Sequence, residues 1–163
     1  MGSIKAKTHL QKLGFSDTDK KSPQHDKIQT WVYRNIKTIL EETFMKNNPH
    51  PYEVSVGKWE HTVIHESGNY KMVVGFVDIK VDIHGKFFIK DSKEHESLTK
   101  TLFIEIKTQI PSLGELIRQM RAYQAFGDRF TSYMVISPDD QFETILNEQG
   151  FWFYKYKDPN LLF

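Results

Sequence analysis

A short apolar segment that carries two charged residues, 102–107 (Leu-Phe-Ile-Glu-Ile-Lys), most constrains the fold of this chain. Its length and its β-branched, aromatic composition favour a strand over a helix. Side chains alternate between the faces of a strand, so Glu105 and Lys107 share one face and the opposite face is aliphatic. Charges on an apolar strand must be paired or solvated. The segment therefore predicts either a half-exposed strand with an ion pair, or a metal-binding carboxylate with a lysine beside it.

Residues 73–83 predict a second strand, with acidic side chains on its non-core face. From residue 76 onward apolar and polar residues alternate strictly, which puts Asp78 and Asp82 on one face. If this strand pairs with 102–107, one of these aspartates approaches Glu105. Two close carboxylates repel each other unless a cation lies between them, and Mg²⁺ takes one or two protein carboxylates while keeping several waters. We therefore expect a Mg²⁺ site, with Asp78 and Asp82 as rival ligands.

The remaining periodicities predict the element order α-β-β-β-α-β-α-β. Helices are expected over about 26–44, 112–126 and 137–150. Strands are expected over 52–66, 70–83, 102–107, 132–136 and 151–156. Between the two strands with acidic residues, we expect a turn at 84–85 and a long polar loop over 91–100. This alternation predicts an α/β fold with a central mixed sheet flanked by helices.

Composition sets the broad class of the protein. The 163 residues suit one domain, which we place at 26–163 after a polar N-terminal arm at 1–25. The formal net charge is only +1. A dedicated nucleic-acid coat protein is usually more basic, so any nucleic-acid binding must rest on a local patch. The chain lacks cysteine and shows neither a membrane-spanning run nor a signal-peptide pattern, so we expect a cytoplasmic protein with no membrane partner.

Three motifs together resemble the PD-(D/E)XK nuclease superfamily over roughly residues 28–157. They are residues 75–78 (Gly-Phe-Val-Asp), 105–107 (Glu-Ile-Lys) and 119–123 (Gln-Met-Arg-Ala-Tyr). They are similar to the D…(D/E)xK…QxxxY series, and the last is most similar to the RecB-type and type I restriction-subunit branches. No proline precedes Asp78, a departure that is common in the superfamily. The resemblance implies the restriction-endonuclease-like fold, and the element order read from the periodicities agrees with it.

The resemblance also implies a chemistry, the metal-dependent hydrolysis of DNA phosphodiester bonds. Mg²⁺, or Mn²⁺ in its place, would be held by Asp78, Glu105 and the carbonyl of Ile106. The first helix of such proteins often adds a glutamate, for which Glu42 fits the helix face better than Glu41. Lys107 would orient the attacking water or stabilise the growing charge on the phosphate.

The helix over 112–126 would supply the remaining site residues. Gln119 and Tyr123, one helical turn apart, would position substrate or a metal-bound water. Arg118, Arg121 and, just beyond the helix, Arg129 would contact phosphate. The alternative for these three arginines is a solvated helix flank.

Two other functions stay open at this point. Fold does not fix function, so the chain could be a catalytically inactive nuclease-fold module that binds nucleic acid or serves assembly. It could also be a structural protein in which Glu105 and Lys107 form an ion pair. A nuclease domain this small would cut both strands of a duplex most simply as a homo-oligomer. His61 and His65 would lie about 13 Å apart along a strand, too far to share one ion.

Overall fold

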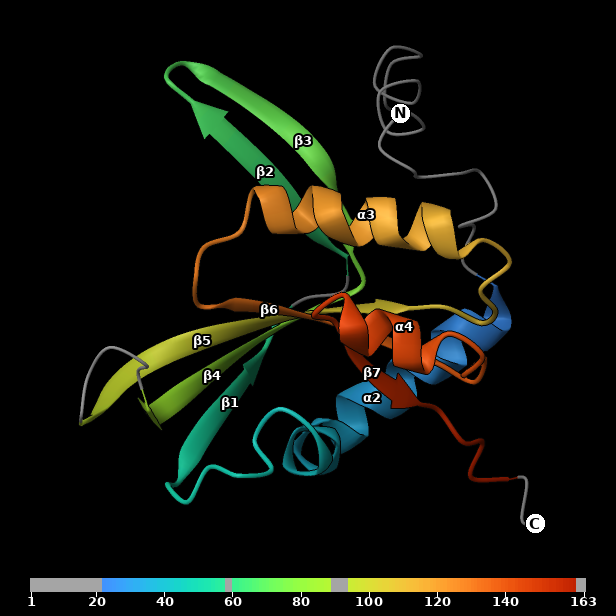
Figure 1. Ribbon diagram of the computed structural model, residues 1–163, viewed down its shortest axis with the longest axis horizontal. Coiled ribbons are helices and arrows are strands. Elements are labelled where there is room, and N and C mark those ends of the chain that lie inside the picture. The colour runs from blue at the N-terminus through green and yellow to red at the C-terminus, as the bar shows by residue number, and fades with distance from the viewer. Residues whose placement is uncertain (1–21, 58–59, 89–93, 161–163) are drawn as a thin grey trace.

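A five-stranded mixed sheet is the centre of the computed structural model, which describes residues 22–57, 60–88 and 94–160 (Figure 1). In chain order the elements are α2 (Pro23–Glu42), β1 (Tyr52–Val56), β2 (His61–Ser67), β3 (Tyr70–Val77), β4 (Ile79–Phe88), β5 (His95–Ile106), α3 (Leu113–Ala125), β6 (Thr131–Ser137), α4 (Glu143–Glu148) and β7 (Trp152–Lys155). The predicted α/β class with a mixed sheet flanked by helices is confirmed. The predicted element order is matched only in part.

The central sheet has the strand order β1-β4-β5-β6-β7. The pairs β1–β4 and β4–β5 are antiparallel, and β5–β6 and β6–β7 are parallel. Strands β2 and β3 form a separate antiparallel hairpin that projects away from this sheet (Figure 1). The two parallel steps each contain a helix, as a crossover between parallel strands requires.

Helix α2 covers one face of the sheet. Its start is fixed by Ser22, whose hydroxyl accepts a hydrogen bond from the N–H of His25 at 3.1 Å, and by Pro23 in the first turn. Its apolar side chains pack with the odd-numbered aliphatic residues of β4 and the even-numbered ones of β5. The helix was expected to begin at 26, so the structure adds a first turn that includes His25.

Helix α3 covers the opposite face. Ser112 caps it by accepting a hydrogen bond from the N–H of Glu115 at 3.3 Å, as the sequence predicts. Leu116 and Met120 pack in a second core with Phe103 of β5 and neighbouring residues of β6. The sheet therefore has a hydrophobic core on each side, and Glu105, which follows Phe103 on the same face, points toward α3.

Two expected strands are each divided in the structure. The expected strand over 52–66 becomes β1 in the central sheet and β2 in the hairpin, and that over 70–83 becomes β3 and β4 with Asp78 between them. At the first break Glu60 has a positive φ of 57°, and its N–H donates to the Asp78 carbonyl at 3.2 Å. The alternation continues through the break at Asp78, so periodicity alone does not show the change of sheet there. At the first break the apolar positions change phase around Gly57, where the sequence itself allows the strand to be broken.

The expected turn at 84–85 and much of the polar loop over 91–100 are wrong. Strand β4 continues to Phe88, and β5 already begins at His95, which pairs with Phe88 at this end of the ladder. Residues 89–93 of the expected loop lie outside the described residues. Polar residues in 95–100 resemble a loop in sequence because this end of the ladder leaves one face to solvent.

The segment expected to open the third helix at 137–140 is not helical, because Ser137 ends β6 and 138–140 form an irregular connection. Helix α4 begins only at Glu143. The carboxylate of Asp139 accepts hydrogen bonds from the N–H of Ile110 at 2.9 Å and from the side chain of Gln141 at 2.9 Å. Burial raises the pKa of Asp139, but these hydrogen bonds outweigh it and the net pKa is lowered. Asp139 thus bonds the connection between β6 and α4 to the connection between β5 and α3, and it does not cap a helix.

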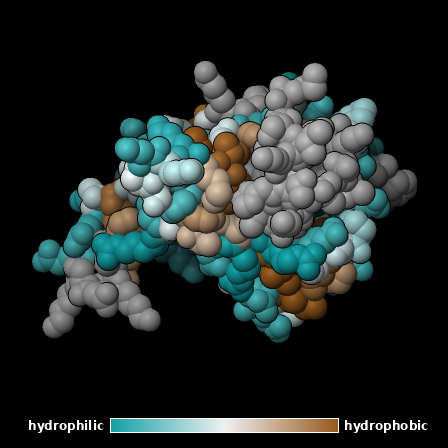
Figure 2. All heavy atoms as spheres, turned by 90° about the horizontal axis from the view of Figure 1, so that it is seen from above, coloured by the Kyte–Doolittle hydropathy of each residue, from teal (hydrophilic) through white to brown (hydrophobic). Residues whose placement is uncertain are grey.

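The β2–β3 hairpin exposes large apolar side chains, namely Ile64, Tyr70, Val73 and Phe76. Viewed from the side on which the hairpin projects, apolar groups lie among polar ones at the surface (Figure 2). The predicted polar arm at 1–25 lies outside the described residues as far as residue 21. None of the helices in the described ranges is long and apolar enough to cross a membrane.

Replacing Gly127 by alanine is expected to destabilise the fold. A Cβ at Gly127 would lie 2.0 Å from the hydroxyl oxygen of Tyr133, a buried side chain whose hydroxyl donates to the Tyr123 carbonyl at 3.3 Å. We expect a loss of roughly 1–3 kcal/mol in the free energy of unfolding, because the ring must shift within a packed core. Gly114→Ala in α3 is the control, since nothing lies within 4 Å of its Cβ. It should be neutral or stabilising in the same urea titration, and equal stabilities of the two variants would contradict the prediction.

Candidate functional site

The candidate site lies where the chain leaves the central sheet at Asp78. Strand β4 pairs with β5 only as far as Ile79, opposite Ile104, and the chain on the other side of Asp78 belongs to β3. Beyond this point, among the residues that the structure describes, no strand pairs with β5 on its β4 side. The Asp78 carboxylate occupies the gap, and its Oδ2 accepts a hydrogen bond from the N–H of Ile106 at 2.8 Å. The local break in the ladder therefore places a carboxylate beside residues 105–107.

The backbone of Ile106 contributes a second oxygen to the same gap. The N–H of Lys107 donates to Ile136 of β6, so the polar groups of the neighbouring residue, Ile106, point to the other side. In an extended strand the N–H and C=O of one residue point to the same side. The carbonyl of Ile106 is thus directed toward Asp78, as the expected ligand set requires.

Glu105 is buried on the face that α3 covers, with a side-chain exposure of 7%. Its Oε1 accepts a hydrogen bond from Gln119 Nε2 at 2.9 Å, and the same nitrogen lies 3.2 Å from the hydroxyl oxygen of Tyr123. The hydroxyl of Tyr123 in turn donates to the carbonyl of Phe76 at 2.6 Å. This chain of contacts links α3 to β5 and to the end of β3, two residues before Asp78.

Lys107 lies next to Glu105 on the same face. Its Nζ is 3.5 Å from Glu105 Oε1, and its side chain is 13% exposed. Asp78 is 4% exposed as a residue. A lysine and two carboxylates are thus brought together at nearly buried positions, where charges interact more strongly than at the surface. Five of the predicted site residues take part in this set of contacts around residues 105–107. They are Asp78, Glu105, Lys107, Gln119 and Tyr123.

His25 and Gln29 on α2 complete the surroundings of Asp78, and sequence reasoning did not propose either of them. His25 Nε2 lies 3.2 Å from Asp78 Oδ1, and Gln29 Nε2 donates to the Asp78 carbonyl at 3.0 Å. Both side chains are buried. Beginning the helix at 26 left His25 in the arm. The Ser22-Pro23 pair is a helix-start signal that would have placed His25 and Gln29 one turn apart on the sheet-facing side.

Glu42, the expected ligand from the first helix, does not lie at this site. It is at the C-terminal end of α2, where its Oε2 accepts a hydrogen bond from the hydroxyl of Tyr154 at 2.7 Å. Thirteen helical residues separate it from Gln29, or about 20 Å at 1.5 Å per residue. Glu41 is exposed at the same end. The prediction chose a residue at the wrong end of the helix, because a helical wheel shows which face a residue is on but not which end of the helix lies near Asp78.

Of the three predicted arginines, Arg121 bonds to the C-terminal region and Arg129 lies toward the other end of the parallel strands. Arg121 donates to the side chain and carbonyl of Gln149 and lies over the ring of Phe151. Arg129 precedes β6, at the end opposite to Glu105, because β5 and β6 run parallel from Thr101 and Thr131. Arg118 is exposed on α3. The structure therefore places Arg121 in a contact between α3 and the C-terminal region rather than at the site.

Asp82, the rival of Asp78, faces the same side of the sheet but makes different contacts. Its carboxylate accepts a hydrogen bond from the hydroxyl of Thr101 at 2.8 Å and lies 3.8 Å from Lys80 Nζ. His61 and His65 stand on the hairpin, where their rings contact Phe103 and Phe126 respectively. Of the two aspartates, Asp78 is the one that reaches the 105–107 segment.

The side chains and backbone at this site can be compared with the ligands that a hard divalent cation needs. Within the described ranges, no group of three or more His, Asp and Glu side chains is arranged to hold a metal ion. Mg²⁺, however, needs only one or two protein carboxylates, with waters and substrate phosphates completing its shell. Asp78 and Glu105 supply carboxylate oxygens, and Asp78 Oδ2 lies against the backbone of Ile106, the residue after Glu105. These are the types of oxygen that Mg²⁺ or Mn²⁺ accepts in proteins, with waters and substrate completing the shell.

Comparisons with known proteins find no relative. No family model, no curated protein and no solved structure matches this chain. The resemblance to the PD-(D/E)XK superfamily thus rests on the three motifs and on the way they come together.

Proposed function

We propose that this protein is a metal-dependent nuclease that hydrolyses phosphodiester bonds, with DNA as its expected substrate. The observation that carries the proposal is the gathering of Asp78, Glu105 and Lys107 at the break between β3 and β4. Three segments distant in sequence supply an acid, an acid with a lysine, and the Gln119–Tyr123 pair. An ion pair alone needs no second buried carboxylate.

Each residue has a distinct role in this mechanism. Asp78, Glu105 and the Ile106 carbonyl would hold Mg²⁺ or Mn²⁺, which polarises the scissile phosphate and lowers the pKa of a bound water. Lys107 orients the attacking water and stabilises negative charge that grows on the phosphate oxygens.

Neighbouring side chains keep the two carboxylates in place. Gln119, held by Tyr123, fixes the orientation of Glu105. His25 and Gln29 fix Asp78 from the other side, through contacts with its carboxylate and its carbonyl respectively. These four act as positioning residues, and His25 Nε2 also lies close enough to Asp78 Oδ1 to share a cation with it.

The second candidate is a nuclease-fold module without catalytic activity. The exposed apolar side chains of the β2–β3 hairpin favour an interaction surface, because contiguous apolar exposure often marks a contact site. Such a module would need neither metal nor an intact lysine. The two candidates therefore differ in one expected result: only the nuclease cuts nucleic acid, and its cutting depends on Glu105 and Lys107.

The deciding experiment is a cleavage assay on supercoiled plasmid and on labelled single-stranded DNA and RNA. It compares wild type with Glu105→Gln in Mg²⁺, Mn²⁺ or EDTA. We expect metal-dependent cutting that EDTA stops and that Glu105→Gln reduces by at least about 100-fold, the size of effect seen when one charge-stabilising group is removed from an active site. Glutamine keeps the acceptor for Gln119, so the fold should survive. Absence of cutting, combined with no metal-induced rise in melting temperature, would favour the inactive module.

A further inference from the structure

One face of the β4–β5 ladder carries hydroxyl and cationic side chains that lead outward from Glu105. The register places Lys80 opposite Phe103, and successive pairs on this face follow at every second residue. We call this run the polar strip. Its members are Lys80, His84 and Lys86 on β4 and Ser97, Thr99 and Thr101 on β5.

The other face of the same ladder is part of the core. Val81, Ile83 and Phe87 are buried there against α2. The polar strip is open by contrast, because its outer four members are exposed and Lys80 and Thr101 are partly so. Along about 20 Å of β4, from Lys80 to Lys86, the sheet therefore shows a polar surface that begins at the candidate site.

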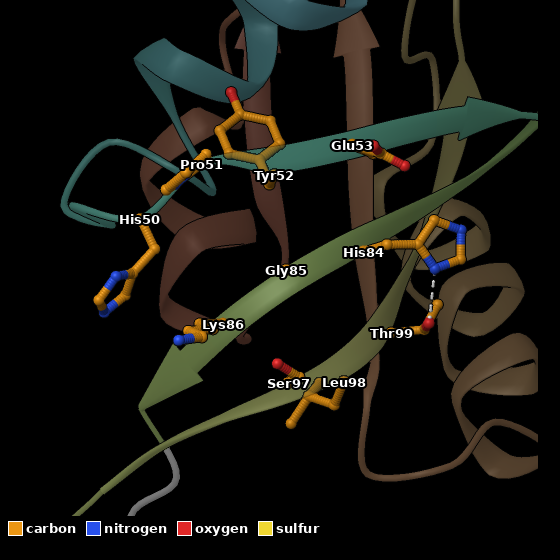
Figure 3. A pocket seen from close by; sticks show the side chains of 10 residues that line it. All are labelled: His50, Pro51, Tyr52, Glu53, His84, Gly85, Lys86, Ser97, Leu98 and Thr99. Atoms are coloured by element: carbon orange, nitrogen blue, oxygen red, sulfur yellow. Dashed lines mark hydrogen bonds between the residues drawn. The ribbon is translucent and has the colours of Figure 1, made fainter.

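A pocket of about 670 Å³ lies at the outer end of the polar strip (Figure 3). Strip residues His84, Lys86 and Ser97 line it together with His50, which precedes β1. The His84 ring is held by its Nδ1, which lies 2.7 Å from the hydroxyl oxygen of Thr99 (Figure 3). Glu53 also lines the pocket and can accept a hydrogen bond from an amino group. This volume falls within the range of small-molecule sites and is sufficient for one nucleotide unit.

One partly exposed ring, that of His61, lies at the inner end of the polar strip, over the buried ring of Phe103. The ring of His61 lies 5.7 Å from that of Phe103, measured between centroids. Burial lowers the pKa of His61 and the nearby Lys80 charge lowers it further, against a smaller opposing effect of Asp82. Asp82 lies on the same face, but its charge is partly compensated by Lys80 and Thr101. Cations interleaved with flat rings are the combination that binds single-stranded nucleic acid.

We propose that the polar strip binds the single nucleic-acid strand that extends from the Asp78–Glu105 site, with phosphates against Lys80 and Lys86 and one base in the outer pocket. This inference rests on the proposed nuclease function and names the form of its substrate. The strip would span about six nucleotides at 3.4 Å per stacked nucleotide. The enzyme then acts on single-stranded segments or strand ends rather than on continuous duplex.

The test measures strand binding without cleavage. In the Glu105→Gln background with EDTA, fluorescence anisotropy gives the affinity for a labelled 12-nucleotide DNA strand over a series of salt concentrations. Each phosphate contact of a single strand contributes about −0.7 to the slope of log affinity against log salt. We expect Lys80→Ala/Lys86→Ala to make this slope less negative by about 1.4, and Lys86→Ala alone by about 0.7. The matched control, Lys37→Ala/Lys46→Ala, removes two exposed lysines in and just after α2, and the slope should stay unchanged.

The outcomes separate this inference from the nuclease proposal. Three results would overturn strand binding by the polar strip even if wild type cuts DNA. They are an unchanged slope in the strip variants, an equal change in the control, and tighter binding of a 12-base-pair duplex than of the strand. Failure of the strand to bind at low salt would overturn it too. Strand binding that depends on Lys80 and Lys86, in a protein that cuts nothing, would support the strip and reject the nuclease.

Discussion

Asp78→Asn is expected to abolish metal-dependent cleavage, with a rate loss on the order of 10³-fold. Asp78 is the residue at which the chain leaves the central sheet, and its carboxylate faces the only stretch of β5 without a strand beside it on that side within the described chain. An amide removes one negative charge from the proposed cation site, which has two carboxylates. A loss of about 4 kcal/mol in transition-state stabilisation corresponds to that factor.

The same substitution should also remove metal-induced stabilisation, which is read by thermal unfolding with and without Mg²⁺ or Mn²⁺. A metal at 100 times its dissociation constant stabilises the native state by about 2.7 kcal/mol, and this gain disappears when the site is lost. Without metal, the variant should melt close to wild type. Asparagine can still accept from the Ile106 N–H and can donate to His25 Nε2.

Asp82→Asn is the matched control, because it makes the same chemical change on the same face. Its oxygen can still accept from Thr101, so the fold should be unaffected. We expect this variant to keep the metal-induced rise in melting temperature and to cleave within a few-fold of wild type at saturating substrate. The reverse result, with Asp78→Asn active and Asp82→Asn inactive, would assign the metal to Asp82 and contradict our assignment.

The faces of the elements were predictable from sequence, but the changes of sheet were not. Alternation in 79–83 and 102–107 correctly put the aliphatic residues that pack against α2 on one face and Glu105 on the other, because a one-residue shift would bury the wrong set. It wrongly put Val77 with Ile79, since Val77 packs in the core on the α3 side. The same alternation continues across Asp78, and it gave no sign that β3 leaves the sheet there. That break depends on tertiary contacts, namely the hydrogen bonds from Gln29 and Glu60 to the Asp78 carbonyl.

The candidate site was predicted better along β5 and α3 than on α2. Glu105, Lys107, Gln119 and Tyr123 come from one strand and the helix that follows it, so local spacing constrains their positions. The contribution of α2 depends on which end of the helix meets Asp78. Helical periodicity is the same at both ends, so it offered Glu42, whereas the structure brings His25. Polar residues on α3 were also expected at its edge, yet Gln119 and Tyr123 are buried because they bond to each other and to the sheet.

Tyr123→Phe is expected to lower the free energy of unfolding by roughly 1–3 kcal/mol, the penalty for leaving a buried hydrogen-bonding group without its partner. The hydroxyl of this fully buried side chain donates to the Phe76 carbonyl at 2.6 Å and receives Gln119 Nε2 at 3.2 Å. Phenylalanine fills the same space, so the change isolates the hydrogen bonds from the packing. Urea unfolding followed by tryptophan fluorescence measures the difference.

Tyr156→Phe is the matched control for this change. Its hydroxyl is also buried, but it makes no hydrogen bond within the described part of the chain. Removing it should leave stability unchanged or raise it slightly, because a buried polar group without a partner is itself unfavourable. Equal destabilisation by the two variants would show that the hydrogen bonds of the Tyr123 hydroxyl add no stability, which would contradict the prediction.

The Tyr123→Phe variant also tests how the fold supports the site. Without the contact to the Tyr123 hydroxyl, Gln119 should orient Glu105 less well. We expect Tyr123→Phe to keep metal-dependent cleavage but to lower its rate several-fold at saturating substrate, at a temperature and denaturant-free condition where the variant is fully folded. Binding of the DNA strand should not change, because the side chain of Tyr123 is fully buried and is not part of the exposed polar strip. A rate equal to that of wild type, together with the loss of stability, would confine Tyr123 to a structural role and leave Glu105 oriented by Gln119 and Lys107 alone.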